Sequence, residues 1–143
     1  MKLSKNFSLE EMLSSDTARR CGIDNKPQSE EVVENLRALC LEVLQPLRDH
    51  LGRPVTITSG YRCKELNKRV GGVRNSQHLK GEAADIRVKN REELIEMMKF
   101  LMDETQFDQL IWEKAGATEW VHVSYKRNGN NRGRVFKLSK CES

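Results

Sequence analysis

The order of the predicted elements indicates an α+β fold in which a small, mostly antiparallel sheet packs against helices. Apolar residues recur at helical spacing through the first half of the chain, whereas three β-rich runs follow one another in its last third. Helices that precede strands in this way are typical of the α+β class rather than of alternating α/β folds. The chain has 143 residues, and domains commonly hold about 100–200 residues. We therefore expect a single domain over residues 1–143.

The helices of the first half are predicted from caps and periodicity. Ser8 is placed to cap a short helix, and Glu11 completes a capping box three residues later. The main core helix begins after Ser29, and Pro46 should kink or loosen its last turn. Its apolar residues recur at i, i+3 and i+4 spacing: Val32, Val33, Leu36, Leu39, Cys40, Val43, Leu44 and Leu47.

The second half adds another helix and most of the strands. The helix is expected from Asn90 to about Asp103, and one or two helical turns precede it in "KELNKRVGG". Strands are predicted where β-branched and aromatic residues cluster between turn residues: "PVTITSG", "AADIRV", "FDQLIWE", "EWVHVSY" and "GRVFKLS". The last three runs are separated only by short turns, which is a meander-like pattern.

The charge balance does not favour a nucleic-acid-binding protein. The formal net charge is +4, and this mild excess permits an anionic partner such as a bacterial wall polymer. The basic residues are interspersed with acidic ones, as in "KNREELIEMMK", and we find no nucleic-acid recognition motif. We therefore expect no nucleic-acid partner.

Cysteine spacing and the N-terminal sequence bear on the cellular compartment. The four cysteines, Cys21, Cys40, Cys63 and Cys141, form no CxxC pair, which argues against a structural zinc site or a thioredoxin-type site. Cys40 lies on the apolar stripe and is expected to be a buried free thiol. "MKLSKNFSLEEML" lacks the apolar run of a signal peptide, and no stretch approaches the roughly 20 apolar residues of a membrane span. We expect a monomer that is cytoplasmic as synthesised.

Three residues of metal-ligand type stand in two segments of the chain. His78 and Asp85 lie in "SQHLKGEAAD", and His122 lies in the alternating run "EWVHVSY". Neutral imidazoles and a carboxylate are good zinc ligands, and three protein ligands leave one position open for catalysis. Each residue alone also has an ordinary structural explanation, as a loop residue, a turn cap or a half-buried strand residue.

A hydrolytic zinc site also needs a base, for which Glu119 is the nearest candidate in the sequence. It stands three residues before His122, so on a regular strand the two side chains would point to opposite faces. Glu119 therefore reaches the site only if the backbone turns or bulges near residues 119–121. The segment "AGATEW" is irregular enough to allow such a bulge.

Two motifs resemble those of a known family. "SQHLKGEAAD" has the form S-x-H-x-x-G-x-A-x-D, and "EWVH" has the form E-x-x-H. In this order, with "ITSGYRCKELNKRVGG" upstream, they resemble the zinc D-alanyl-D-alanine carboxypeptidase family. That family includes D,D-carboxypeptidases, vancomycin-resistance D,D-dipeptidases and the L-alanyl-D-glutamate endopeptidases of phage lysins. The resemblance extends roughly from Phe7 to Tyr125.

The resemblance implies a hedgehog/D,D-peptidase-type fold and a role for each site residue. Three residues are implied as the Zn2+ ligands: His78, Asp85 and His122. Glu119 is implied as the general base, and Arg62 as the residue that stabilises the oxyanion and orients the substrate. Ser76 is implied to lie near the substrate or to shape the loop that carries the first ligand.

The implied activity is hydrolysis of peptide bonds in peptidoglycan stem peptides by metal-activated water. The enzyme would be a D-Ala-D-Ala carboxypeptidase or an endopeptidase of the phage-lysin kind, and holin-type release would suit delivery of a chain without a signal peptide. The alternative is a non-catalytic zinc-containing binding module of the same fold. Glu119 favours the enzyme, because a binding module needs no base beside its third ligand.

Overall fold

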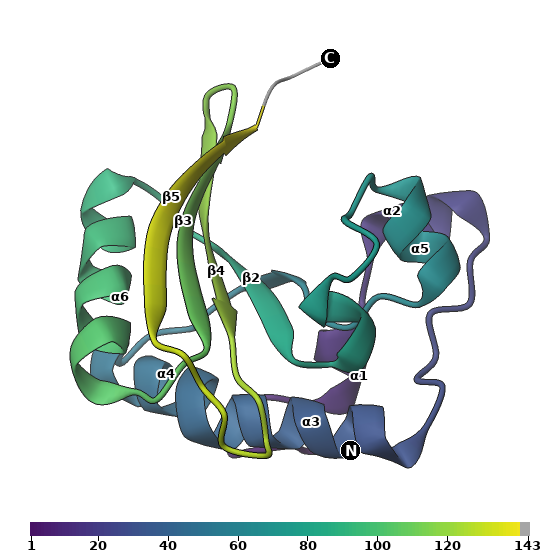
Figure 1. Ribbon diagram of the computed structural model, residues 1–143, viewed down its shortest axis with the longest axis horizontal. Helices are drawn as coiled ribbons and strands as arrows, with labels where there is room; N and C mark the ends of the chain where they lie inside the picture. The colour runs from purple at the N-terminus through teal and green to yellow at the C-terminus, as the bar shows by residue number, and fades with distance from the viewer. Residues whose placement is uncertain (141–143) are drawn as a thin grey trace.

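The structure, a computed structural model, describes residues 1–140, and Figure 1 shows a sheet with helices on both sides. The helical elements are α1 (Leu9–Leu13), α2 (Asp16–Cys21), α3 (Glu30–Leu39), the π-helical η1 (Cys40–Leu44), α4 (Gln45–Leu51), α5 (Lys64–Arg69), the 3-10 helix η2 (Gln77–Lys80) and α6 (Arg91–Glu104). The strands are β1 (Ile57–Ser59), β2 (Ala83–Arg87), β3 (Gln109–Ala115), β4 (Thr118–Ser124) and β5 (Arg134–Lys140). This architecture confirms the predicted α+β class.

The five strands follow the order β1-β2-β4-β3-β5. Neighbouring strands are antiparallel except β3 and β5, which run parallel. The mostly antiparallel sheet is therefore confirmed, but the meander-like arrangement is wrong for its last strand. β4 is already paired on both edges, with β2 and β3, so β5 crosses over and joins the free edge of β3.

Side-chain alternation gives the sheet two unlike faces. On the face towards α6, Leu110, Val121 and Val123 are fully buried in one core with Leu94 and Leu101 of that helix. The other face, called here the site face, carries polar residues of β2, β3 and β4. Burying one such aliphatic side chain contributes about 1.5–3 kcal/mol. The core therefore sets the strand register, and the register places every residue of the site face.

The predicted helix starts at Ser8, Ser29 and Asn90 are confirmed, and the core helix loosens beside Pro46, as predicted. Ser8, Ser29 and Asn90 each accept a hydrogen bond from a first-turn N–H through the side chain. The core helix passes from α3 into the π-helical η1 and continues as α4 to Leu51. Proline has no N–H to contribute to the helical ladder, and the ladder widens into the π turn directly before it.

The described cysteines are free thiols. Cys40 is fully buried, as predicted, and this burial raises the pKa of its thiol to about 12. Cys21 is exposed and Cys63 is partly buried, while Cys141 lies outside the described residues. Within residues 1–140, none of the helices combines the length and the apolar character that crossing a membrane requires.

Candidate metal centre

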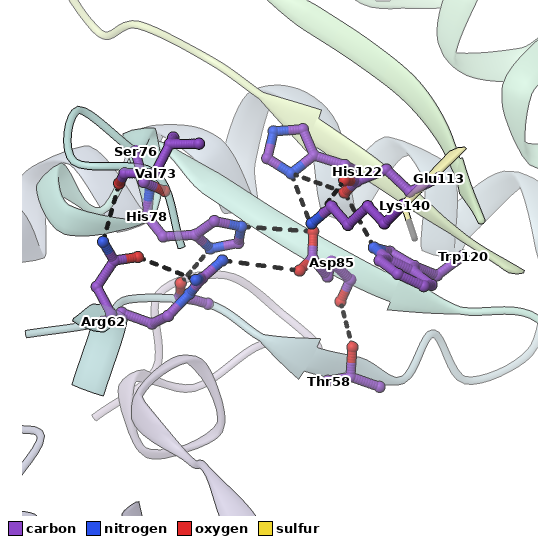
Figure 2. A network of polar contacts seen from close by, with 12 residues as sticks. Thr58, Arg62, Val73, Ser76, His78, Asp85, Glu113, Trp120, His122 and Lys140 are labelled. Carbon is purple, nitrogen blue, oxygen red and sulfur yellow. Dashed lines mark hydrogen bonds and ion pairs between the residues drawn. The ribbon is translucent and has the colours of Figure 1, made fainter. Parts of the chain in front are cut away.

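His78, Asp85 and His122 come together on the site face of the sheet, as Figure 2 shows. His78 Nε2 lies 3.4 Å from Asp85 Oδ1, and His122 Nδ1 lies 2.9 Å from the same oxygen. Donor atoms of all three residues lie within 4.8 Å of one another. Ligands at about 2.0–2.2 Å from a tetrahedral zinc ion stand about 3.3–3.6 Å apart. The three side chains are therefore close to the spacing that zinc requires.

Local structure explains how each ligand reaches this place. Asp85 and His122 are direct partners in the antiparallel β2–β4 ladder, so their side chains share one face. His78 comes from η2, and the Ser76 hydroxyl caps this helix by accepting the His78 N–H at 3.2 Å. Gly81 ends η2 with φ of 74°, and a Cβ there would lie 2.7 Å from the α3 backbone. Glycine is thus required where the ligand loop contacts the core helix.

The protonation of His78 suits a metal ligand. Its Nδ1 lies 2.7 Å from the Gly60 carbonyl, which only accepts hydrogen bonds, so Nδ1 carries the proton and Nε2 the lone pair. That Nε2 atom is buried and has no hydrogen-bond partner among the described residues. Burial lowers the pKa of His78, and Asp85 offsets this only in part, so the ring is neutral at pH 7.

Asp85 supplies the negative charge of the cluster. Burial alone would raise the pKa of Asp85, but the neighbouring imidazoles, including a hydrogen bond from His122 Nδ1 at 2.9 Å, lower it well below its usual range. An ionised carboxylate between two imidazoles, one of them with an unpartnered lone pair, is a donor set that a divalent cation satisfies. The three predicted ligands therefore fit Zn2+.

Glu119 does not join this cluster. β4 pairs in continuous register with both β3 and β2, so residues 119–121 contain no bulge. The Glu119 carboxylate lies on the opposite face of the sheet, where it accepts hydrogen bonds from Arg91 and, at 2.9 Å, from Trp112 Nε1. The Arg91 hydrogen bond lowers the pKa of Glu119, which weakens it as a base. Its role as the general base stays a prediction, and the geometry favours another carboxylate.

That carboxylate belongs to Glu113 of β3. Its Oε2 lies 3.8 Å from His122 Nδ1, and its side chain is 7% exposed. Trp120 Nε1 donates to Oε2 at 3.0 Å, and Lys140 Nζ lies 3.1 Å from Oε1. These contacts, visible in Figure 2, hold the carboxylate in place beside the metal ligands.

A signal for Glu113 is present in the sequence. Ala115 pairs with Thr118 across a two-residue hairpin loop, Gly116–Ala117, and glycine is typical of such loops. Counting back from this loop pairs Glu113 with Trp120, which places both on the face of His122. Identifying the loop type is therefore enough to bring Glu113 to the site.

Arg62 reaches the cluster from the segment between β1 and α5. Its Nη2 lies 4.0 Å from Asp85 Oδ2, and its side chain is 12% exposed. Burial lowers the pKa of Arg62, but a guanidinium stays charged at any ordinary pH. Ser76 lines the same cleft, and its hydroxyl oxygen accepts the His78 N–H, so it shapes the ligand loop. Contact of Ser76 with substrate stays a prediction.

A cleft of about 470 Å³ opens over the metal-ligand residues, a size in the usual range for ligand sites. Its floor carries the charged and ligand-type residues Arg62, His78, Asp85, Glu113 and His122. Its walls include the apolar residues Val70, Val73 and Leu138 and the cationic residues Lys80, Lys126 and Arg132. Apolar and cationic side chains therefore line the same cleft as the metal-ligand residues.

A three-ligand metal set, a buried carboxylate and a half-buried arginine in one cleft are typical of a hydrolytic metal centre. The family described as Peptidase M15 matches residues 5–124, and the chain belongs to this family. A curated relative, the zinc D-Ala-D-Ala carboxypeptidase of Streptomyces albus G, is 43% identical over 44 residues. This stretch is 30% of the chain and 17% of the relative, so the chain matches only a small part of that protein.

These findings confirm the family resemblance that the two motifs indicate. They also confirm Zn2+ as the cofactor, because the family, a relative described as a zinc carboxypeptidase and the donor set agree.

Proposed function

We propose that the protein is a zinc metallopeptidase that hydrolyses peptide bonds in the stem peptides of peptidoglycan. The observation that carries the proposal is the convergence of the metal-ligand set, Glu113 and Arg62 in one cleft. The name of the Streptomyces relative supports a stem-peptide substrate. The bond is the terminal D-Ala-D-Ala bond or an internal one, and action on the cell wall is part of the proposal.

The proposed mechanism assigns one step to each residue beside the ligands. Bound zinc supplies Lewis acidity, which acidifies water and polarises a carbonyl. Glu113 takes the proton from the attacking water and later gives it to the leaving amine. No acyl-enzyme forms, because water attacks the carbonyl carbon directly. Arg62 donates hydrogen bonds to the negative charge that develops on the carbonyl oxygen. The buried floor of the cleft strengthens these electrostatic interactions, because few water molecules screen them.

Metal content and product formation together test the proposal. Purified protein is subjected to elemental analysis and then incubated with peptidoglycan, with and without a chelator, and the products are identified by mass spectrometry. We expect one zinc ion per chain and chelator-sensitive release of D-alanine or of cleaved stem peptides. Zinc without any product would favour the non-catalytic binding module instead.

A matched pair of variants tests the choice of base. Glu113→Gln should keep zinc and the fold but lose hydrolysis by about 10²–10⁴-fold, the usual contribution of a general base. Glu119→Gln should keep most of the activity, because the Glu119 carboxylate lies on the opposite face of the sheet. If Glu119→Gln lost the activity and Glu113→Gln kept it, the base would be Glu119, as the motif resemblance implies.

A further inference from the structure

We propose that Asn25, Asn67 and Gly72 are positioning residues that fix Arg62 at the metal centre before substrate binds. The catalytic consequence of this inference rests on the proposed function. The position of the arginine does not, because it can be measured in the protein without substrate.

Asn25 holds the backbone on both sides of Arg62. Its Nδ2 donates to the Tyr61 carbonyl at 2.9 Å, and its Oδ1 accepts the Cys63 N–H at 2.8 Å. Nδ2 also donates at 2.9 Å to a carbonyl at the end of α1. Asn25 is only 9% exposed, and these three hydrogen bonds satisfy its buried amide group. The Arg62 N–H donates at 3.0 Å to the carbonyl of His78. The backbone that carries the arginine is therefore tied directly to η2.

Asn67 holds the guanidinium group itself. Its Oδ1 accepts from Arg62 Nη1 at 3.0 Å, and its Nδ2 donates to the Val73 carbonyl at 2.9 Å. The residue is 4% exposed. Its own carbonyl accepts the Gly72 N–H at 2.9 Å. One side chain on α5 thus fixes both the arginine and the loop of residues 70–73 that forms a wall of the cleft.

Gly72 provides the space for this contact. A Cβ at residue 72 would lie 2.1 Å from Asn67 Oδ1 and 2.6 Å from Arg62 Nη1, closer than real side-chain atoms approach. The backbone of Gly72 does not have positive φ, so its conformation does not demand glycine. The reason for glycine here is therefore the room that it leaves beside the guanidinium.

Fixing the arginine in advance has a clear physical benefit. A free arginine side chain loses rotamer entropy when it is fixed in one orientation. If the protein orders this side chain during folding, the cost is not repeated in the transition state, where a preorganised donor is most effective. A displacement of about 1 Å at a reacting centre can cost about 10²-fold in rate. Small changes around the guanidinium should therefore alter turnover more than binding.

A double-mutant cycle measures this coupling. Asn67→Ala and Gly72→Ala should each lower kcat by about tenfold or more with a smaller change in KM, and both should retain zinc. In an Arg62→Ala background, neither substitution should lower kcat further, because the group that they position is gone. Equal losses in both backgrounds would mark a merely structural role and overturn the proposal.

A spectroscopic test needs no substrate. The Arg62 Nε–H resonance, assigned by its disappearance in Arg62→Lys, should shift and broaden in Asn67→Ala and Gly72→Ala. It should stay in place in the matched control Asn130→Ala, whose residue is exposed. An unmoved resonance in Gly72→Ala would overturn the proposal, and this variant alone decides if Asn67→Ala does not fold. Absence of hydrolysis by the wild type would count against the proposed function only.

Discussion

Acid should weaken the attachment of β5 through one buried carboxylate, that of Asp108. This residue is fully buried directly before β3, where Arg132 Nε and Nη2 donate to its two carboxylate oxygens at 3.0 and 2.8 Å. The Arg132 N–H and Gln77 Nε2 each add a hydrogen bond at 3.0 Å. Burial alone would raise the pKa of Asp108, but hydrogen bonds from Arg132 and Gln77 lower it from 3.8 to about 2.

The size and direction of the effect follow from this pKa. One pKa unit corresponds to about 1.4 kcal/mol, so the shift from 3.8 to about 2 represents about 2 kcal/mol of folding free energy. Because the pKa is lower in the folded state than in the unfolded state, this stabilisation is present above pH 3.8. It is lost as the pH falls from that value towards about 2.

Urea unfolding of the wild type and Asp108→Asn, side by side from about pH 6 to about pH 2, isolates this contribution. The other acidic residues titrate alike in both proteins and cancel in the difference. The wild type should be the more stable protein at about pH 6, and its advantage should shrink by about 2 kcal/mol as the carboxylate is protonated. A difference that stays constant over this range would refute the assignment of the stabilisation to ionised Asp108.

Two further predictions concern a ligand and a thiol. His78→Ala should lower the zinc content in elemental analysis, since the substitution removes one of three protein donors; full occupancy would exclude His78 from the site. In the native protein Cys40 should resist alkylation, because it is buried and its thiol pKa is about 12, while exposed Cys21 reacts. Peptide mass spectrometry measures both sites, and rapid labelling of Cys40 in folded protein would contradict the buried position.

Local signals in the sequence predict most elements, whereas they do not predict how the strands are ordered. The caps at Ser8, Ser29 and Asn90 are predicted because a capping side chain bonds within its own first turn. The place of β5 depends on which strand edges are already paired, and no short window of sequence records this. The short helices α2 and η2 were not predicted, because each is too short to show an apolar periodicity.

In the candidate site, too, some residues are predicted from local sequence and others depend on contacts between distant segments. Two motifs predict the three metal-ligand residues, because each motif lies within a continuous stretch of chain. The place of Glu113 beside the metal ligands depends on the register between β3 and β4. The argument for Glu119 considered one strand alone and so did not include this pairing. Asn25 and Asn67 depend on contacts between distant loops, and an isolated asparagine in a sequence most often indicates only a turn.

The position of β4 in the centre of the sheet also limits which insertions and deletions the chain tolerates. His122 lies between Val121 and Val123, and both valines are fully buried on the opposite face. A single-codon insertion within this strand would exchange the two faces, placing an imidazole in the core and a valine at the metal. Loops that wall the cleft have no such alternation of faces to preserve. New peptide specificities should therefore arise by insertions and deletions in these loops, while the length of the central strand is inherited unchanged.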